Sequence, residues 1–178
     1  MKLMLPIING FEDIEAITVV DVLRRAGIQV DIVGITASMV ESKSKIKIMA
    51  EKRLNEIAVP KEYDGIILVG GPGYLPMGKS VALVNLMKTF ATQGKLVAAI
   101  GEAVSILATN GLLDGKKAVI APGMEKMLTY PRDQPVMIDN NIITSQAPGT
   151  AMQFALAIVK KLKGDSAAQF LKKELVVV

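Results

Sequence analysis

The 178-residue sequence contains no cysteine, no histidine and no tryptophan. Without cysteine the chain has no thiolate nucleophile, no disulfide and no sulfenic-acid redox sensor. Without histidine it has no imidazole for acid–base catalysis or for a catalytic triad. The two absences together also exclude a zinc site built from cysteine and histidine.

Long apolar runs are missing as well. No stretch approaches the roughly 20 residues of a membrane helix, and the N-terminus lacks the apolar core and cleavage site of a signal peptide. We therefore expect a soluble cytoplasmic protein with no membrane contact. The formal net charge is only +4 and aromatic residues make up 4%. With no clustered basic motif, the sequence does not favour nucleic-acid binding.

Short apolar strands alternate with segments of helical period, which is typical of one α/β domain spanning residues 1–178. Strands are predicted at 3–8, 29–34, 66–69, 96–100 and 142–144, with weaker ones at 117–121 and 136–138. Helices are predicted at 14–26, 80–93 and 102–110, from 148 to about 162, and near the C-terminus. A glycine that can cap the helix follows each of the first four: Gly27, Gly94, Gly111 and Gly164. The alternation predicts a doubly wound sandwich, a mostly parallel sheet with helices on both faces.

Two local patterns carry more specific predictions. Ile14, Ile17, Val20 and Leu23 recur every three residues and predict the apolar face of the first helix. Residues 45–49 (KIKIM) alternate strictly between lysine and apolar residues. This alternation indicates a half-exposed edge strand or one arm of a hairpin.

The candidate ligand site lies where three segments should meet. In open parallel sheets, ligands bind beyond the C-terminal ends of the strands. Residues 9–15 follow the first strand, Gly70-Gly71-Pro72-Gly73 follows the third, and Gly101-Glu102 follows the fourth. The glycine-rich turn can offer backbone N–H groups to an oxyanion, but it lacks the spacing of a phosphate-binding or dinucleotide motif. The alternative interpretation is that the glycines only allow a tight turn at the end of the strand and bind nothing.

Several short motifs occur in an order that matches a known family. They are residues 10–15 (GFEDIE), 20–27 (VDVLRRAG), Gly70-Gly71, 98–100 (AAI), and 148–150 (PGT) leading into 154–159 (FALAIV). With them the chain resembles the ThiJ/PfpI superfamily, which is class I glutamine amidotransferase-like, in the branch of the Parkinson-associated deglycase. The resemblance covers essentially the whole chain. It implies a flavodoxin-like α/β fold and a homodimer with one small-molecule pocket per subunit.

The resemblance also implies a role for particular positions. The family's nucleophilic cysteine, on a sharp turn between strand and helix, falls on Gly101. The glutamate that hydrogen-bonds the thiol matches Glu15, and the oxyanion-binding turn matches Gly70 and Gly71. The histidine of many family pockets falls on Ala121. Since glycine adopts strained backbone angles freely, Gly101 is the residue expected where the turn is kept and the thiol is lost.

Glu102, directly after the elbow, has two interpretations. A carboxylate in a first helical turn is stabilised by the helix dipole. Alternatively, Glu102 and Glu15 share the pocket, where two carboxylates supply an acid and a base or bind a cation. Ser105 is interpreted as a helix-face serine. Tyr130 and Arg132 are either surface residues or ligand contacts near the pocket.

Two functions from different classes follow. The first is a non-catalytic, small-ligand-binding or stress-related homodimer that uses the pocket without a thiol. The second is an enzyme acting on a small carbonyl or amide, glyoxalase/deglycase-like or hydrolase-like, with Glu15 as base and Glu102 as acid or orienting group. Cysteine-dependent glyoxalase, deglycase or protease chemistry is excluded by the composition. No metal and no cofactor is predicted.

Overall fold

The computed structural model describes residues 1–57 and 60–177, and within them a seven-stranded sheet forms the centre of the molecule. Its strands run in the order β10-β11-β7-β6-β1-β2-β5. Neighbouring strands pair in parallel except for β10, which pairs antiparallel with β11. The strand bounds are β1 Lys2–Ile7, β2 Gln29–Gly34, β5 Lys52–Arg53, β6 Gly65–Leu68, β7 Leu96–Ile100, β10 Val136–Asp139 and β11 Ile142–Ser145. The predicted α/β fold with a mostly parallel sheet is confirmed.

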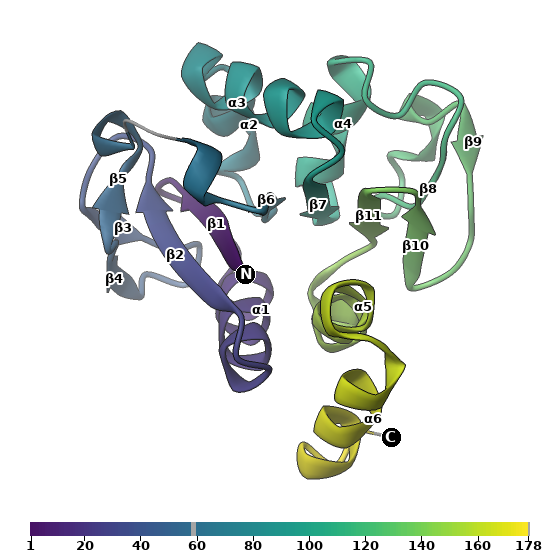
Figure 1. Cartoon of the computed structure of the whole chain (residues 1–178). Coiled ribbons are helices and arrows are strands. Elements are labelled where there is room, and N and C mark those ends of the chain that lie inside the picture. Colours follow the sequence, from purple (N-terminus) through teal and green to yellow (C-terminus); the bar gives the residue numbers. More distant parts are fainter. Residues whose placement is uncertain (58–59, 178) are drawn as a thin grey trace.

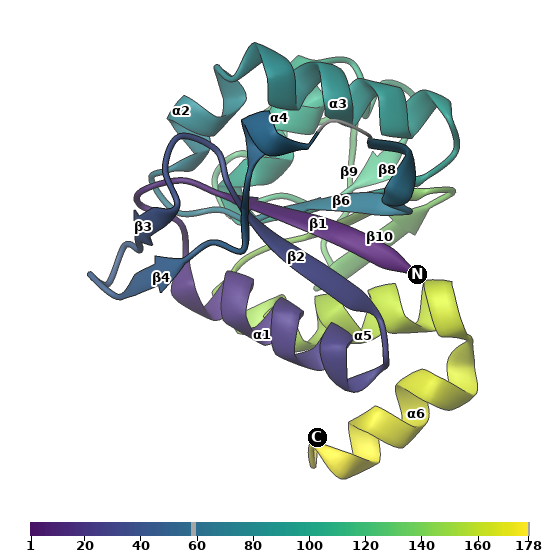
Figure 2. The same ribbon diagram turned by 60° about the vertical axis from the view of Figure 1, so that its left-hand side comes forward.

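Helices cover both faces of this sheet (Figure 1, Figure 2). One face carries α1 (Asp13–Arg25) and α5 (Ala151–Lys163), and α6 (Asp165–Glu174) packs on α5. The other carries α2 (Tyr74–Gly78), α3 (Val81–Thr92) and α4 (Val104–Thr109). No helix among the described residues is both long enough and apolar enough to cross a membrane.

The central strand β1 joins the two halves of the core. Leu3, Leu5 and Ile7 belong to the apolar cluster that contains residues of α1 and α5. Met4 belongs to the cluster that contains residues of α3 and α4. This division follows from strand geometry, because successive side chains point to opposite faces of a sheet. Both faces of β1 are therefore buried, as its continuous apolar sequence requires.

Two small sheets lie outside the main one. β3 (Met39–Glu41) and β4 (Lys47–Met49) form an antiparallel hairpin, so the alternating segment is a hairpin arm. β8 (Lys117–Ala118) pairs with β9 (Tyr130–Pro131) and is shorter than predicted. Neither β5, at the edge of the main sheet, nor α2 is among the sequence predictions. Elements of two and five residues are too short to give a clear periodic pattern.

The glycines that follow helices behave as expected, whereas one helix face does not. Gly27, Gly94, Gly111 and Gly164 all have positive φ, a backbone conformation that glycine adopts more readily than other residues. The predicted apolar face of α1 is wrong in its first half, because Ile14 and Ile17 are 55% and 46% exposed. The buried face of α1 is made instead by Glu15, Ala16, Val19, Val20, Val22 and Leu23. This face is buried because α5 packs along α1 on that side.

The order of the strands creates the crevice that the site occupies. From β1 the chain crosses to β2 on one side and later returns to β6 on the other side of β1. At such a switch point the loops that follow the two strands diverge. Backbone hydrogen bonds nevertheless tie the two loops together: Glu12 N donates to Gly70 O at 2.9 Å and Gly73 N donates to Gly10 O at 3.1 Å. Gly101 directly follows β7, the next strand along.

Candidate functional site

The sharp turn after β7 is present. Gly101 has φ +64°, and a short 3-10 helix of residues 101–103 leads from it into α4. A Cβ placed on Gly101 would lie 2.7 Å from Glu15 Oε1. The turn therefore has the backbone expected of a nucleophile elbow, and any side chain at position 101 would press against the Glu15 carboxyl.

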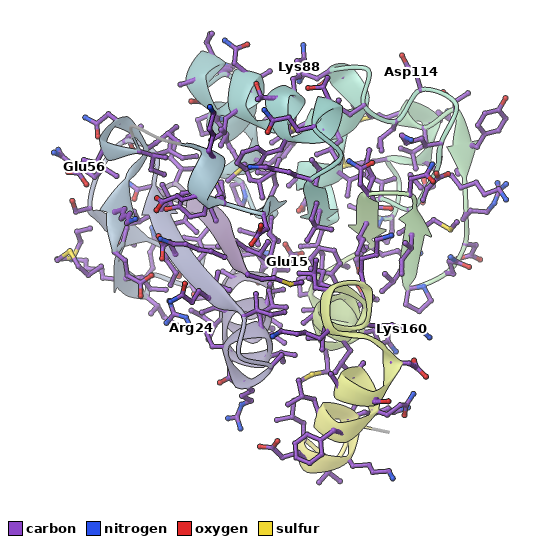
Figure 3. All side chains as sticks on the ribbon, viewed as in Figure 1. Glu15, Arg24, Glu56, Lys88, Asp114 and Lys160 are labelled. Atoms are coloured by element: carbon purple, nitrogen blue, oxygen red, sulfur yellow. The ribbon has the colours of Figure 1, made fainter. Side chains whose placement is uncertain are left out.

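Glu15 comes from the first turn of α1 and has no exposed surface. Figure 3 shows it in the interior, whereas the labelled Glu56, Lys88 and Asp114 lie at the periphery. Its Oε2 accepts a hydrogen bond from Gly70 N at 2.6 Å, and its Oε1 has no partner among the described residues. Burial raises the pKa of Glu15 to about 8 against the opposing effect of the Gly70 N–H, with repulsion from Glu102 and Glu12 adding to the rise. At neutral pH Glu15 is therefore mostly a neutral acid.

Glu102 reaches the same glycine turn from the segment after β7. Its Oε2 accepts a hydrogen bond from Gly71 N at 3.1 Å, and its side chain is half-buried. A Cβ placed on Gly70 would collide with Glu102 Oε2 and would lie 3.1 Å from Glu15 Oε2. The two carboxyls therefore converge on one point of the turn. The structure thus brings the Glu15 and Glu102 carboxyls close to each other at this turn.

Position 71 requires glycine for this arrangement. Gly71 has φ +83°, and a Cβ there would lie 2.5 Å from Gly10 O and 2.7 Å from Glu12 N. Any side chain would push the turn away from the loop after β1. With glycine, the two loops close on each other and the Gly71 N–H points to Glu102.

Two further charged residues that sequence reasoning missed lie beside the carboxyl pair. Glu12 is only 8% exposed, and its Oε2 lies 3.1 Å from Lys43 Nζ. Lys43 is held by its own backbone, because its N–H donates to Phe11 O at 2.9 Å. The loop between β3 and β4 thus places a cation near the site, which opposes the rise in the pKa of Glu15. Lys43 lies in a lysine-rich stretch, so no local pattern singles it out.

The remaining candidates lie around this centre. Ala121 is buried in the apolar cluster that also contains Ala103 and Val104. Ser105 Oγ donates to Glu102 O at 2.6 Å, as a helix serine does. Tyr130 is 49% exposed, whereas Arg132 lines a surface cavity of about 390 Å³. The residues of that cavity are Ile120, Glu125, Pro131, Arg132, Asp133 and Gln146. Within residues 1–57 and 60–177, no three acidic side chains are arranged to hold a metal ion.

Comparisons with known proteins place the chain in a family. The family model described as "DJ-1/PfpI family" matches residues 1–161. Protein dj-1beta of Drosophila melanogaster is 37% identical over 174 residues, covering 94% of this chain and 92% of that protein. A protein of Caenorhabditis elegans named as a glutathione-independent glyoxalase is 33% identical over 171 residues, covering 92% and 89%.

Solved structures give the same result. The oxidised DJ-1 of Toxoplasma gondii has a TM-score of 0.93 and 32% identity, covering 98% of this chain and 97% of that one. The crystal structure of Drosophila melanogaster DJ-1beta also has a TM-score of 0.93, with 34% identity over 99% and 98% of the two chains. The chain, with glycine at the elbow and no cysteine in its sequence, belongs to the DJ-1/PfpI family.

Proposed function

We propose that this protein binds a small molecule at the Gly101 elbow and does not convert it. The observation that carries the proposal is the elbow itself. Its backbone is bent as for a nucleophile, with φ +64° over a buried Glu15, but position 101 has no side chain and the sequence has no cysteine. An elbow that keeps this backbone but has no reactive side chain favours binding of a small molecule over thiol chemistry.

A glyoxalase function does not transfer from the relative that carries that name. In this family such chemistry starts with the attack of a thiolate on an aldehyde carbon, and no residue here can supply a thiolate. The two backbone donors that would face a developing oxyanion also have partners already. Gly70 N donates to Glu15, and Gly71 N donates to Glu102. Both features favour the binding function.

The second candidate function is an enzyme that uses the two carboxyls on a small carbonyl or amide. The convergence of Glu15 and Glu102 on Gly70 favours it. Its roles are exchanged, however, because a carboxyl with a pKa of about 8 is mostly protonated at neutral pH and therefore serves as the acid. In this alternative Glu15 donates the proton, Glu102 accepts one, and Glu15→Gln abolishes turnover without unfolding the protein.

We also propose that the protein works as a homodimer. Large apolar side chains are exposed on α1 and on the β3–β4 hairpin, which lie next to each other in Figure 2. They are Ile14, Ile17, Met39, Ile46 and Met49, each 46–61% exposed. An exposed apolar surface of this kind is typical of protein contacts. Sedimentation of the parent and of Ile17→Glu tests this, with a dimer expected for the parent and a monomer for the variant.

The test of the binding function is methylglyoxal consumption and lactate formation by the purified protein. The parent, Gly101→Cys and Gly101→Ala are compared, the alanine variant being a control for the strain of any side chain at this position. We expect no turnover by the parent or by Gly101→Ala, and slow turnover by Gly101→Cys. Enzyme-like turnover by the parent that is lost in Glu15→Gln would contradict the proposal and establish the carboxylate enzyme.

A further inference from the structure

A second cavity, of about 270 Å³, lies between α2, α4 and residues 124–127. The two helices follow the glycine turn and the elbow and lie on the same face of the sheet (Figure 1). None of the carboxyls and glycines of the candidate site described above lines this cavity. It is therefore a separate place in which a ligand can bind.

Gly78, in the wall of this cavity, has no structural need to be glycine. It is the last residue of α2 and its φ is not positive. A Cβ there would meet only the side chain of Ile106, at 3.4 Å, which is an ordinary van der Waals contact. At Gly65 and Gly73, whose φ is not positive either, a Cβ would lie 2.6 and 2.8 Å from a neighbour. Because glycine destabilises a helix relative to alanine, Gly78 lowers stability and leaves the cavity open.

Most of the wall is apolar. Met124 and Met127 contribute flexible thioether side chains, and Leu75 contributes an aliphatic one. Leu75 and Met127 are 57% and 41% exposed, so both remain open to a ligand. Among the described residues, those that line the cavity carry no charge. Since methionine sulfur makes favourable contacts with aromatic rings, this wall suits a neutral aromatic molecule.

Two hydroxyl groups give the cavity its polar character. Ser105 Oγ donates to Glu102 O at 2.6 Å, and Thr109 Oγ1 donates to Ser105 O at 2.9 Å. Each hydroxyl has one hydrogen, which these bonds use, and two lone pairs that accept hydrogen bonds. Ser105 and Thr109 therefore offer acceptors, which favour a ligand with an N–H or O–H donor.

We propose that this cavity binds a neutral aromatic molecule of one or two rings that carries a single N–H or O–H donor. The ring packs against Met124 and Met127, and its donor reaches the hydroxyl of Ser105 or Thr109. The volume supports a ligand of this size, because sites for drug-sized ligands measure about 300–1,000 Å³. The inference does not depend on the function proposed for the Gly101 elbow.

The experiment titrates indole into protein labelled with ¹³C at the methionine methyl groups. We expect saturable chemical-shift changes for Met124 and Met127. Met39 and Met49, which are exposed on the β3–β4 hairpin, should not respond. Benzofuran has the shape of indole without its N–H, so it should bind about three- to tenfold more weakly. Equal binding of the two probes would contradict the role of the hydroxyl acceptors.

Two variants fill the cavity from different elements. Gly78→Leu places a side chain against Ile106 without a left-handed backbone, and Thr109→Phe fills the cavity from the exposed end of α4. Each should bind indole about tenfold or more weakly than the parent, because the added side chain occupies the space of the ring. If one variant does not fold, the other still tests the proposal.

Thr92→Phe is the matched control for Thr109→Phe. Thr92 ends α3 as Thr109 ends α4, and both hydroxyls donate to the carbonyl three residues earlier, at 2.9 and 3.3 Å. Thr92 does not line the cavity, so Thr92→Phe should bind indole as the parent does.

The inference is overturned if indole shifts Met39 and Met49 as strongly as Met124 and Met127, or if both filled variants bind indole as the parent does. It is also overturned if sedimentation shows that the filled variants lose a dimer that the parent and Thr92→Phe form. The cavity would then hold a side chain of a second copy. Methylglyoxal turnover reports on the elbow alone, so the outcome there does not decide the outcome here.

Discussion

Two carboxyls near opposite ends of the central sheet have pKa values shifted in opposite directions. At the C-terminal end, Glu15 is fully buried, makes one backbone hydrogen bond and has a pKa of about 8. Toward the other end, Asp31 of β2 accepts from Tyr63 Oη at 2.7 Å, with Lys2 Nζ at 3.0 Å and Lys52 Nζ at 3.1 Å. Burial alone would raise the pKa of Asp31, but these hydrogen bonds hold it below its usual value.

The difference distinguishes a cluster that stabilises the fold from a cluster that is a candidate functional site. The Asp31 cluster is complete, because every charge has a partner and both lysines also lie over the Tyr63 ring, at 4.9 and 5.6 Å. The Glu15 cluster is incomplete, since one buried oxygen has no partner. Polar groups that are buried and unsatisfied tend to occur at functional sites. The incomplete cluster lies where the strand order predicts a ligand site.

The largest expected effect comes from removing the titration of Glu15. Between pH 4.5 and about 8 the folded state keeps a proton that the unfolded chain has released, so the free energy of unfolding falls as pH rises. We expect Glu15 to account for a loss on the order of 3–5 kcal/mol across this window, and Glu15→Gln to abolish it. Urea unfolding at pH 5, 7 and 9 measures this. Parallel curves for the two proteins would show that Glu15 is ionised in the folded state.

A smaller effect of opposite sign is expected at Asp31. Its pKa is lowered on folding, so the stability it contributes is present above pH 3.8 and is lost as pH falls below that value. Asp31→Asn keeps an acceptor for Tyr63 but removes the charge from both lysines. It should cost about 1–2 kcal/mol at pH 7 and progressively less at acid pH. A cost that does not change with pH would assign the effect to packing.

The smallest expected effect compares two glycines of similar backbone. Gly101 and Gly94 have φ +64° and +70°, but only a Cβ on Gly101 has a near neighbour, Glu15 Oε1 at 2.7 Å. Alanine at either position should cost about 1 kcal/mol for the left-handed backbone. Gly101→Ala should cost about 1 kcal/mol more, because Glu15 must move. Equal unfolding free energies for the two variants would mean that the space above the elbow is open.

Much of the fold was predictable because it depends on local patterns. The strands at 29–34 and 96–100 match β2 and β7 to the residue, because the alternation of QVDIVG and the apolar run LVAAI are both typical of strands. The exposed Ile14 and Ile17 were assigned wrongly because helical period alone gives two adjacent apolar stripes on α1. Only the position of α5 decides which stripe is buried, and that is a tertiary contact.

The residues of the site could be predicted from the sequence, but the contacts between their side chains could not. Resemblance placed Glu15, Gly70, Gly71 and Gly101 at one end of the sheet, where the structure has them. That Glu102 turns back to Gly71 N depends on a side-chain conformation, on which sequence spacing has no influence. Lys43 reaches Glu12 through a hairpin loop about 30 residues away, and no local pattern encodes that contact.

The most direct test of this comparison is a ¹³C titration of the Glu15 and Asp31 side-chain carboxyls in one set of NMR spectra. The account predicts a midpoint near pH 8 for Glu15 and a midpoint below 3.8 for Asp31. With those values the elbow holds a neutral acid at pH 7 that can donate to a ligand. A Glu15 midpoint near 4.5 would contradict the account, because Glu15 would then be an ionised base beside Glu102 at neutral pH. That is the state required by an enzyme with Glu15 as base and Glu102 as acid.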